Sequence, residues 1–220
     1  MAAQIGSELV LYGAQFRDES VLGATPEWLF KIDQDGTRLR TMALAGTRWQ
    51  NQARTEEQEA KDRYEHQLVV DDVCARLGDF GALECGKTHW RAAGKGLEHL
   101  ETPITLHAST RLDAAQMVKL LHPTPAVGVF PRSEEAQRWL WGLPGHEWRE
   151  DFGAPWLVVN NLDQRAWALV GLRQIRLSET ALCIPAGCGV VQGSEEEIEW
   201  NEIQQKILSV KRQWGLAPKA

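Results

Sequence analysis

The stretch that decides the fold is residues 186–206, AGCGVVQGSEEEIEWNEIQQK, in which a glycine turn leads into an acidic helix. Apolar residues recur through residues 194–214 with the period of an α-helix, so we expect a helix with a buried stripe. That stripe would consist of Trp200, Ile203, Ile207, Val210 and Trp214. Glu199, Glu202 and Lys206 stand beside it, where a buried face meets a cleft. Their spacing also suits an exposed Glu–Lys pair, so the pattern leaves both a surface pair and a polar site open.

The residues around the turn favour the polar site. Gly187 and Gly189 allow backbone N–H groups to approach an anion. Arg173, on the preceding strand, offers a planar fork that matches a carboxylate. A carboxylate-binding corner beside an acid cluster needs a bridging cation, and Mg²⁺ binds protein carboxylates, water and substrate oxygens together. We therefore expect a magnesium and carboxylate site in this region.

Outward from this stretch, strands and helices come in alternating groups. Alternating apolar residues and turn signals predict strands over 8–16, 20–32, 37–46, part of 99–110, 155–161, 165–177 and 181–191. The last three would form an antiparallel meander. Capping residues and periodicity predict further helices over 55–77, 113–121 and 133–141, and the glycine-rich residues 79–96 are expected to be irregular. The predicted class is α+β, with antiparallel β-sheets flanked by helices.

Composition excludes several functions. The 220 residues suffice for one domain over 1–220, and the net charge of −6 without a long basic run argues against a nucleic-acid partner. No apolar run is long enough to cross a membrane, and the first residues lack a signal-peptide pattern, so we expect a cytoplasmic protein. Four cysteines occur without a CxxC pair, which predicts free thiols in a reducing compartment: Cys74, Cys85, Cys183 and Cys188.

With these motifs in place, residues 186–206 resemble the AGAGIV-x-x-S-x-x-x-EW-x-E-x-x-x-K signature of chorismate-utilising enzymes. That family includes isochorismate, anthranilate, aminodeoxychorismate and salicylate synthases. Five further blocks resemble the family's blocks in the same order: GATPEWLF at 23–30, ALAGTR at 43–48, KDRYEHQLVVDDV at 61–73, EHLETPI at 98–104 and LHPTPAVGVFPR at 121–132. The HPTPA loop is similar to that of isochorismate-forming enzymes, whose nucleophile is water, whereas the amine-transferring branch carries a TGAPK-like sequence. The resemblance implies a shortened α/β sandwich of the anthranilate synthase component I type and a single chorismate-binding domain over 1–220.

The resemblance also implies a role for each matching residue. Glu27 would be the general acid that protonates the departing C4 hydroxyl of chorismate, which requires a raised pKa. The implied Mg²⁺ ligands are Glu65, Glu199 and Glu202. The implied contacts to the substrate are Gly46, Thr47, His99, Arg173, Gly187 and Lys206. Chorismate would be the small-molecule partner of a monomer or homodimer.

Two departures from the family pattern stand out. The family's general-base lysine lies in a K-V-V-L-x-R strand farther before the acid than the 26 residues that precede Glu27 here, so we expect a domain truncated at its N-terminal side. Sheet edges left bare by lost strands would need a covering partner. In addition, FGAPWL stands where the family prefers Y/F-x-G-x-V-G, and Pro155 and Trp156 would either narrow the substrate pocket or close it.

Three functional hypotheses remain at this level. The first is Mg²⁺-dependent conversion of chorismate to isochorismate. The second is a binding or accessory protein that retains affinity for the ligand without turnover. The third is different chemistry on the same scaffold. Outside the site, His66 is expected to be a structural core histidine, and Asp71 and Asp72 are expected to lie on a solvated helix face rather than form a second acid pair.

Overall fold

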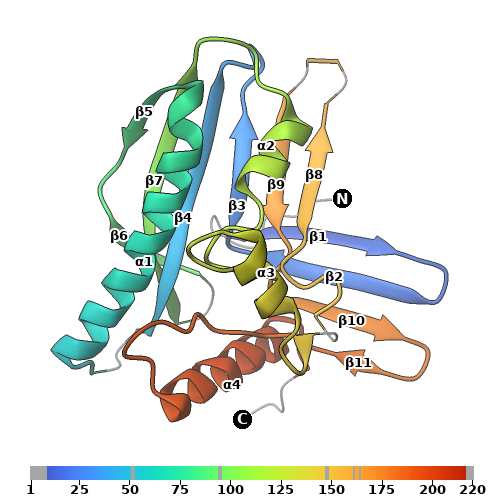
Figure 1. Ribbon diagram of the computed structural model, residues 1–220. Coiled ribbons are helices and arrows are strands. Elements are labelled where there is room, and N and C mark those ends of the chain that lie inside the picture. The colour runs from blue at the N-terminus through green and yellow to red at the C-terminus, as the bar shows by residue number, and fades with distance from the viewer. Residues whose placement is uncertain are drawn as a thin grey trace.

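The protein is described by a computed structural model that places residues 9–50, 53–93, 96–146, 149–160, 162–163 and 165–216. Figure 1 shows one large sheet with helices α1 and α2 on one face and a smaller sheet whose strands run across its lower end. The large sheet has seven strands in the order β5-β7-β4-β3-β9-β8, with β6 also pairing with β7, and the small sheet has the order β1-β2-β10-β11. Neighbouring strands pair antiparallel in both sheets, as the sequence predicts.

The element boundaries follow the sequence signals closely in the helices. The strands are β1 Val10–Gln15, β2 Glu19–Thr25, β3 Trp28–Ile32, β4 Arg38–Trp49, β5 Gly81–Cys85, β6 His89–Ala92, β7 Leu97–Ala108, β8 Pro155–Val159, β9 Ala166–Val170, β10 Gln174–Ser178 and β11 Leu182–Cys183. The helices are α1 Glu56–Leu77, the short 3₁₀ helix η1 Gly78–Phe80, α2 Ala114–Leu121, α3 Glu134–Trp141 and α4 Glu196–Gln213.

Helix α1 begins where the sequence predicts because its first turn is capped from both sides. The Thr55 side chain accepts a hydrogen bond from the backbone N–H of Gln58, and the Gln58 side chain accepts one from the backbone N–H of Thr55. This capping box satisfies two N–H groups that have no partner within the helix. Asp113 and Ser133 cap α2 and α3 from one side only, each through a side-chain oxygen that accepts one backbone N–H.

The main hydrophobic core lies between the large sheet and the helices α1 and α2. Phe30 and Leu39 from the β3–β4 hairpin are fully buried there, as are Leu77 from α1 and Met117 from α2. Alternate residues of β4 point to this core, so its first half reads exposed, buried, exposed, buried. The core therefore fixes the position of α1, which carries part of the candidate site.

The structure corrects several strand predictions. The predicted strand over 20–32 divides at Pro26 into β2 and β3, which join different sheets because proline has no N–H to continue a ladder. The predicted meander also divides, because its middle strand over 165–177 splits into β9, which pairs with β8 in the large sheet, and β10, which pairs with β11 and β2 in the small sheet. Within residues 181–191 only Leu182–Cys183 is a strand, and the segment expected to be irregular contains β5 and β6.

On α1, the predictions for His66 and Asp71 are confirmed and the prediction for Asp72 is wrong. His66 is buried, as expected, with Nε2 2.7 Å from Thr102 Oγ1. Asp72, by contrast, was predicted on a solvated face but is 6 % exposed, and it pairs with Arg76 and with Arg132 at 3.0 Å. Its neighbour Asp71 is exposed, as predicted. Among the described residues, no helix combines the length and hydrophobicity needed to cross a membrane.

Candidate active site

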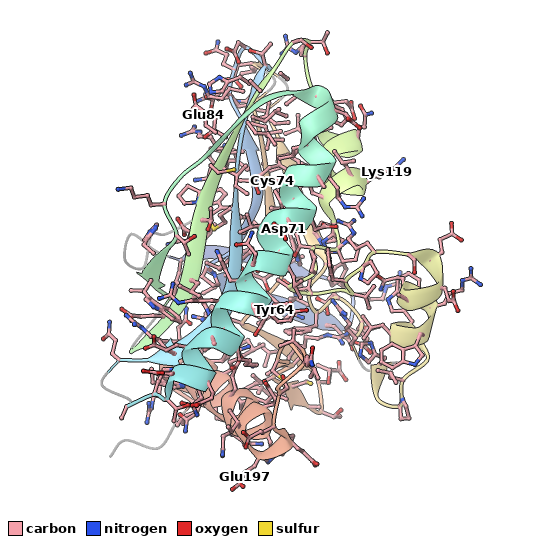
Figure 2. All side chains as sticks on the ribbon, turned by 60° about the vertical axis from the view of Figure 1, so that its left-hand side comes forward. Tyr64, Asp71, Cys74, Glu84, Lys119 and Glu197 are labelled. Atoms are coloured by element: carbon pink, nitrogen blue, oxygen red, sulfur yellow. The ribbon has the colours of Figure 1, made fainter. Side chains whose placement is uncertain are left out.

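The ten candidate residues come from six separated parts of the chain and meet at one end of the large sheet. Figure 1 shows α4 lying across the lower ends of α1 and β4, below the helical layer. Figure 2, in the rotated view, shows the first turns of α1 directly beside α4. The end of β4, the start of β7 and the loop before β10 supply the remaining polar groups. The sequence alone could not show this convergence, since its members are up to 180 positions apart.

His99 holds Arg173 in a fixed orientation. The Arg173 guanidinium can only donate, so the 2.9 Å contact from its NH2 atom requires an unprotonated Nε2 on His99. The ring proton is then on Nδ1, which donates to the carbonyl oxygen of Gly46 at 3.1 Å. Burial, together with the nearby charge of Arg173, lowers the pKa of His99 well below its usual value and keeps the ring neutral. His99 therefore acts on Arg173, while its predicted direct contact to substrate stays a prediction.

Arg173 has the properties of an anion-binding side chain. It is 8 % exposed, and burial lowers its pKa to about 10, so it stays charged near neutral pH. Its backbone lies in the left-handed region at φ 52°, a conformation that residues other than glycine rarely adopt. Such conformations persist where the surrounding structure over-determines them, often at functional sites. The guanidinium is thus a buried cation on a constrained backbone.

Gly46 gives the end of β4 its local shape. The register between β4 and β7 shifts between Ala45 and Thr47, and Gly46 has a positive φ of 73°. A β-carbon at this position would lie 3.1 Å from Cβ of Asp62 on α1, which leaves little room for any other residue. The irregularity turns the Gly46 carbonyl towards His99 and the Thr47 hydroxyl towards α4.

The Thr47 hydroxyl and Lys206 converge on Glu202. Thr47 donates to Glu202 Oε1 at 3.1 Å, and Lys206 Nζ lies 2.6 Å from the same oxygen. Lys206 also donates to the carbonyl oxygen of Gly187 at 2.9 Å. Lys206 therefore ties α4 to the glycine turn, and the predicted cluster of turn, lysine and acid is present.

A second cation links the remaining acids. Lys61 Nζ lies 2.5 Å from Glu199 Oε1 and 3.6 Å from Glu65 Oε2. Burial raises the pKa of Glu65, and the Lys61 charge partly offsets the effect. Lys61 has no role among the sequence predictions, although its position four residues before Glu65 on the same helix could have indicated one.

Gly189 packs directly against Glu65. A β-carbon on Gly189 would lie 2.3 Å from Oε1 of Glu65, so any larger residue would displace this carboxylate. Gly187 is less restricted, because its β-carbon would meet only Phe152 at an ordinary distance of 3.7 Å. Gly189 therefore packs against a protein carboxylate, and the approach of backbone N–H groups to a bound anion stays a prediction.

Glu27 is a buried carboxyl whose pKa is raised. It lies between β2 and β3 at 5 % exposure, and burial raises its pKa from 4.5 to about 8, with Lys206 acting in the opposite direction. A carboxyl with this pKa is protonated at neutral pH and can donate a proton. This property is what the sequence comparison expects of a general acid at this position.

Helix α4 keeps the predicted stripe except at its first member. Trp200, expected in the buried stripe, is 58 % exposed, whereas Glu199 is 6 % exposed and packs inward. Val210 is buried as predicted, and the other three members of the stripe are partly buried. The helix turns its acids inward because Lys61, Lys206 and Thr47 stabilise them there, which the apolar pattern could not reveal. The Glu202–Lys206 pair is therefore part of a partly buried polar cluster, which is the alternative that the residues around the turn favoured.

The carboxylates fit Mg²⁺ in their chemistry but do not form a preassembled cage. Within the residues that the structure places, no three acidic, histidine or cysteine side chains stand close enough together to hold a metal ion. Glu199 Oε2, however, is buried without a hydrogen bond of normal geometry, although the Cys188 thiol lies beside this carboxylate. Three carboxylates face two lysine ammonium groups, so the cluster keeps one excess negative charge. Oxygen donors with an unsatisfied acceptor suit a hard divalent cation.

The departure at Trp156 lies beside the site. Its ring packs against Tyr12 with centroids 5.0 Å apart, and its indole nitrogen would lie 2.7 Å from a β-carbon on Gly171. Gly171 stands two residues before Arg173 on the same connection. Whether Trp156 narrows a substrate pocket stays a prediction.

Comparison with known proteins places this fold in one family. Residues 3–214 match the family model described as chorismate binding enzyme, and the chain belongs to that family. Among curated relatives it is 33% identical over 214 residues to the salicylate biosynthesis isochorismate synthase of Pseudomonas aeruginosa, covering 91% of this chain and 43% of the relative. It is 28% identical to isochorismate synthase MenF of Pasteurella multocida, covering 90% and 47%.

Solved structures place the fold in the same group. The isochorismate synthase MenF of Escherichia coli has a TM-score of 0.74 at 26% identity, covering 92% of this chain and 48% of that chain. The DhbC protein of Bacillus anthracis has a TM-score of 0.77 at 25% identity, covering 95% and 58%. Anthranilate synthase component I of Streptococcus pneumoniae, at 21% identity, shares the fold with a TM-score of 0.73. The chain spans about half the length of the curated relatives it matches.

Proposed function

We propose that this protein converts chorismate to isochorismate in a Mg²⁺-dependent reaction. Water adds at C2 of the ring while the C4 hydroxyl departs as water, so substrate and product are isomers. The observation that carries the proposal is Glu27, a buried carboxyl with a pKa raised to about 8 beside the cationic group of Lys206. Glu27 would donate the proton that the departing hydroxyl needs. Isochorismate synthases among the relatives support the same reaction.

Charge balance supports both the substrate and the metal. Glu65, Glu199 and Glu202 pair with Lys61 and Lys206, and the buried Arg173 beside His99 adds a third positive charge, so the six groups are neutral together. Chorismate brings two carboxylates, and one divalent cation restores neutrality. Burying unbalanced charge is costly, so substrate and cation are expected to bind together.

Each binding group has a defined task in this proposal. Arg173, held by His99, would bind one substrate carboxylate through its planar fork, with backbone N–H groups near Gly187 beside it. Lys206 would bind the ring carboxylate, and Gly46 and Thr47 would contact the ring from the end of β4. Mg²⁺, held by the three glutamates, would neutralise a substrate carboxylate and lower the energy of charge that develops on the ring.

Turnover can be tested directly with the purified protein. Incubation with chorismate and Mg²⁺, followed by chromatography, is expected to give isochorismate, and Glu27→Gln is expected to lower the rate at least about a hundredfold. Glu179→Gln, at an exposed turn, serves as the matched control and should leave the rate unchanged. Absence of product from the wild-type protein would refute the enzymatic proposal.

A second candidate is a protein that binds chorismate without converting it. Its motivation is that both lysines found in the cluster, Lys61 and Lys206, are engaged with carboxylates and so are poorly placed to deprotonate water. This candidate predicts thermal stabilisation by chorismate plus Mg²⁺ without product, worth about 2.7 kcal/mol at a hundredfold excess over Kd. A ligand that leaves the melting temperature unchanged would exclude both candidates.

A further inference from the structure

Two cysteines far from the candidate active site lie in contact with each other. Cys74 is on α1 near its C-terminal end, and Cys85 is the last residue of β5, where it pairs across the strand with Ile104. Their sulfur atoms are 3.4 Å apart, and both thiols are free. Figure 2 labels Cys74 on the helix and Glu84, the neighbour of Cys85, on the strand beside it.

The two thiols differ in their access to solvent. Cys85 is exposed, so a dissolved oxidant can reach it, whereas Cys74 is half-buried against the core. Burial, followed by the hydrogen bond with Cys85, raises the pKa of the Cys74 thiol to about 12. An exposed thiol next to a shielded one is the arrangement of an attacking and a resolving cysteine.

We propose that Cys74 and Cys85 form a modification site at which a peroxide links α1 to β5 through a reversible disulfide. The Cys85 thiolate attacks one oxygen of hydrogen peroxide, which breaks the O–O bond and gives a sulfenic acid and hydroxide. The Cys74 sulfur then attacks the sulfenic sulfur, its proton leaves with the displaced hydroxide as water, and the S–S bond forms. In total two thiols and one peroxide give one disulfide and two waters.

The local structure permits this closure. A disulfide has a sulfur–sulfur distance of about 2.05 Å, so the two atoms need to approach by only about 1.4 Å. The connection between them contains η1 and begins at Gly78, around which a β-carbon would have open space. Because Cys85 is exposed, a reducing dithiol can attack the disulfide and restore both thiols.

Peptide mapping of the full chain tests the proposal independently of any chorismate chemistry. Trypsin releases Cys74 in residues 64–76, YEHQLVVDDVCAR, and Cys85 in residues 77–87, LGDFGALECGK, while Cys183 and Cys188 share residues 177–206. After brief treatment with hydrogen peroxide and alkylation of free thiols, we expect the first two peptides to be joined. Dithiothreitol should separate them again.

Variants distinguish this pair from general thiol oxidation. Cys183→Ser should still form the joined peptides, and Cys85→Ser should not. Oxidation should raise the melting temperature of wild-type protein by about 5 °C or more, because a cross-link restricts the unfolded chain, and should not do so for Cys85→Ser. The proposal is overturned if both peptides are recovered alkylated after peroxide, or if Cys85 is joined to residues 177–206. The wild-type map gives this answer even if a variant fails to fold.

Discussion

In the Glu27→Gln variant, an uncharged amide replaces a carboxyl that is 5 % exposed. The carboxyl ionises near pH 4.5 in the unfolded chain, but burial raises its pKa in the folded protein to about 8. Between these pH values the folded protein keeps a proton that the unfolded chain has released. Unfolding is therefore increasingly favoured as the pH rises through this window, and the effect stops growing above about pH 8.

The size of this effect follows from the same two pKa values. One unit of pKa corresponds to about 1.4 kcal/mol, so the raised pKa of Glu27 lowers the free energy of unfolding by at most about 5 kcal/mol at high pH. Water entry and relaxation of the structure reduce this upper limit. We therefore compare the free energies of unfolding of Glu27→Gln and wild type at two pH values. The variant should gain about 2 kcal/mol or more over wild type between pH 5 and pH 8.5.

Urea unfolding followed by tryptophan fluorescence measures the difference across a pH series. Glu179→Gln, which replaces an exposed turn carboxyl, should follow the wild-type curve throughout. The reasoning fails if wild type and Glu27→Gln differ by the same free energy at every pH, because Glu27 would then ionise alike in both states.

Two further predictions concern the carboxylates proposed to bind Mg²⁺ and the stability of the fold. Gly189→Ala should displace Glu65 and weaken Mg²⁺ binding about tenfold or more in titration calorimetry, and an unchanged Kd would contradict the close packing. Asp72→Ala leaves the partly buried Arg132 guanidinium without its carboxylate, so the free energy of unfolding should fall by about 3 kcal/mol. Asp71→Ala, on the exposed face, should change it by less than about 0.5 kcal/mol, and equal losses would argue against the ion pair.

Local signals predicted the helices well. Thr55, Asp113 and Ser133 cap α1, α2 and α3 as expected, because a cap depends on a side chain and a backbone N–H only a few residues away. The β3–β4 hairpin was also predictable, since its turn and alternating pattern are local. The pairing partners of the strands were not predictable, because an alternating pattern indicates a strand but not which strand it pairs with. For example, β10 pairs with β2, more than half of the chain away.

The candidate site was also predictable only in part. The sequence determined that this is a chorismate binding enzyme and which residues match the family's motifs, because those motifs are short and keep their order. Only the tertiary structure decided that Glu199 faces inward and Trp200 outward, and that Lys61 joins the acids of α1 and α4. The inward side of α4 is set by ionic partners on other elements, and the energy of a buried carboxylate depends on those distant charges more than on its own neighbours in sequence.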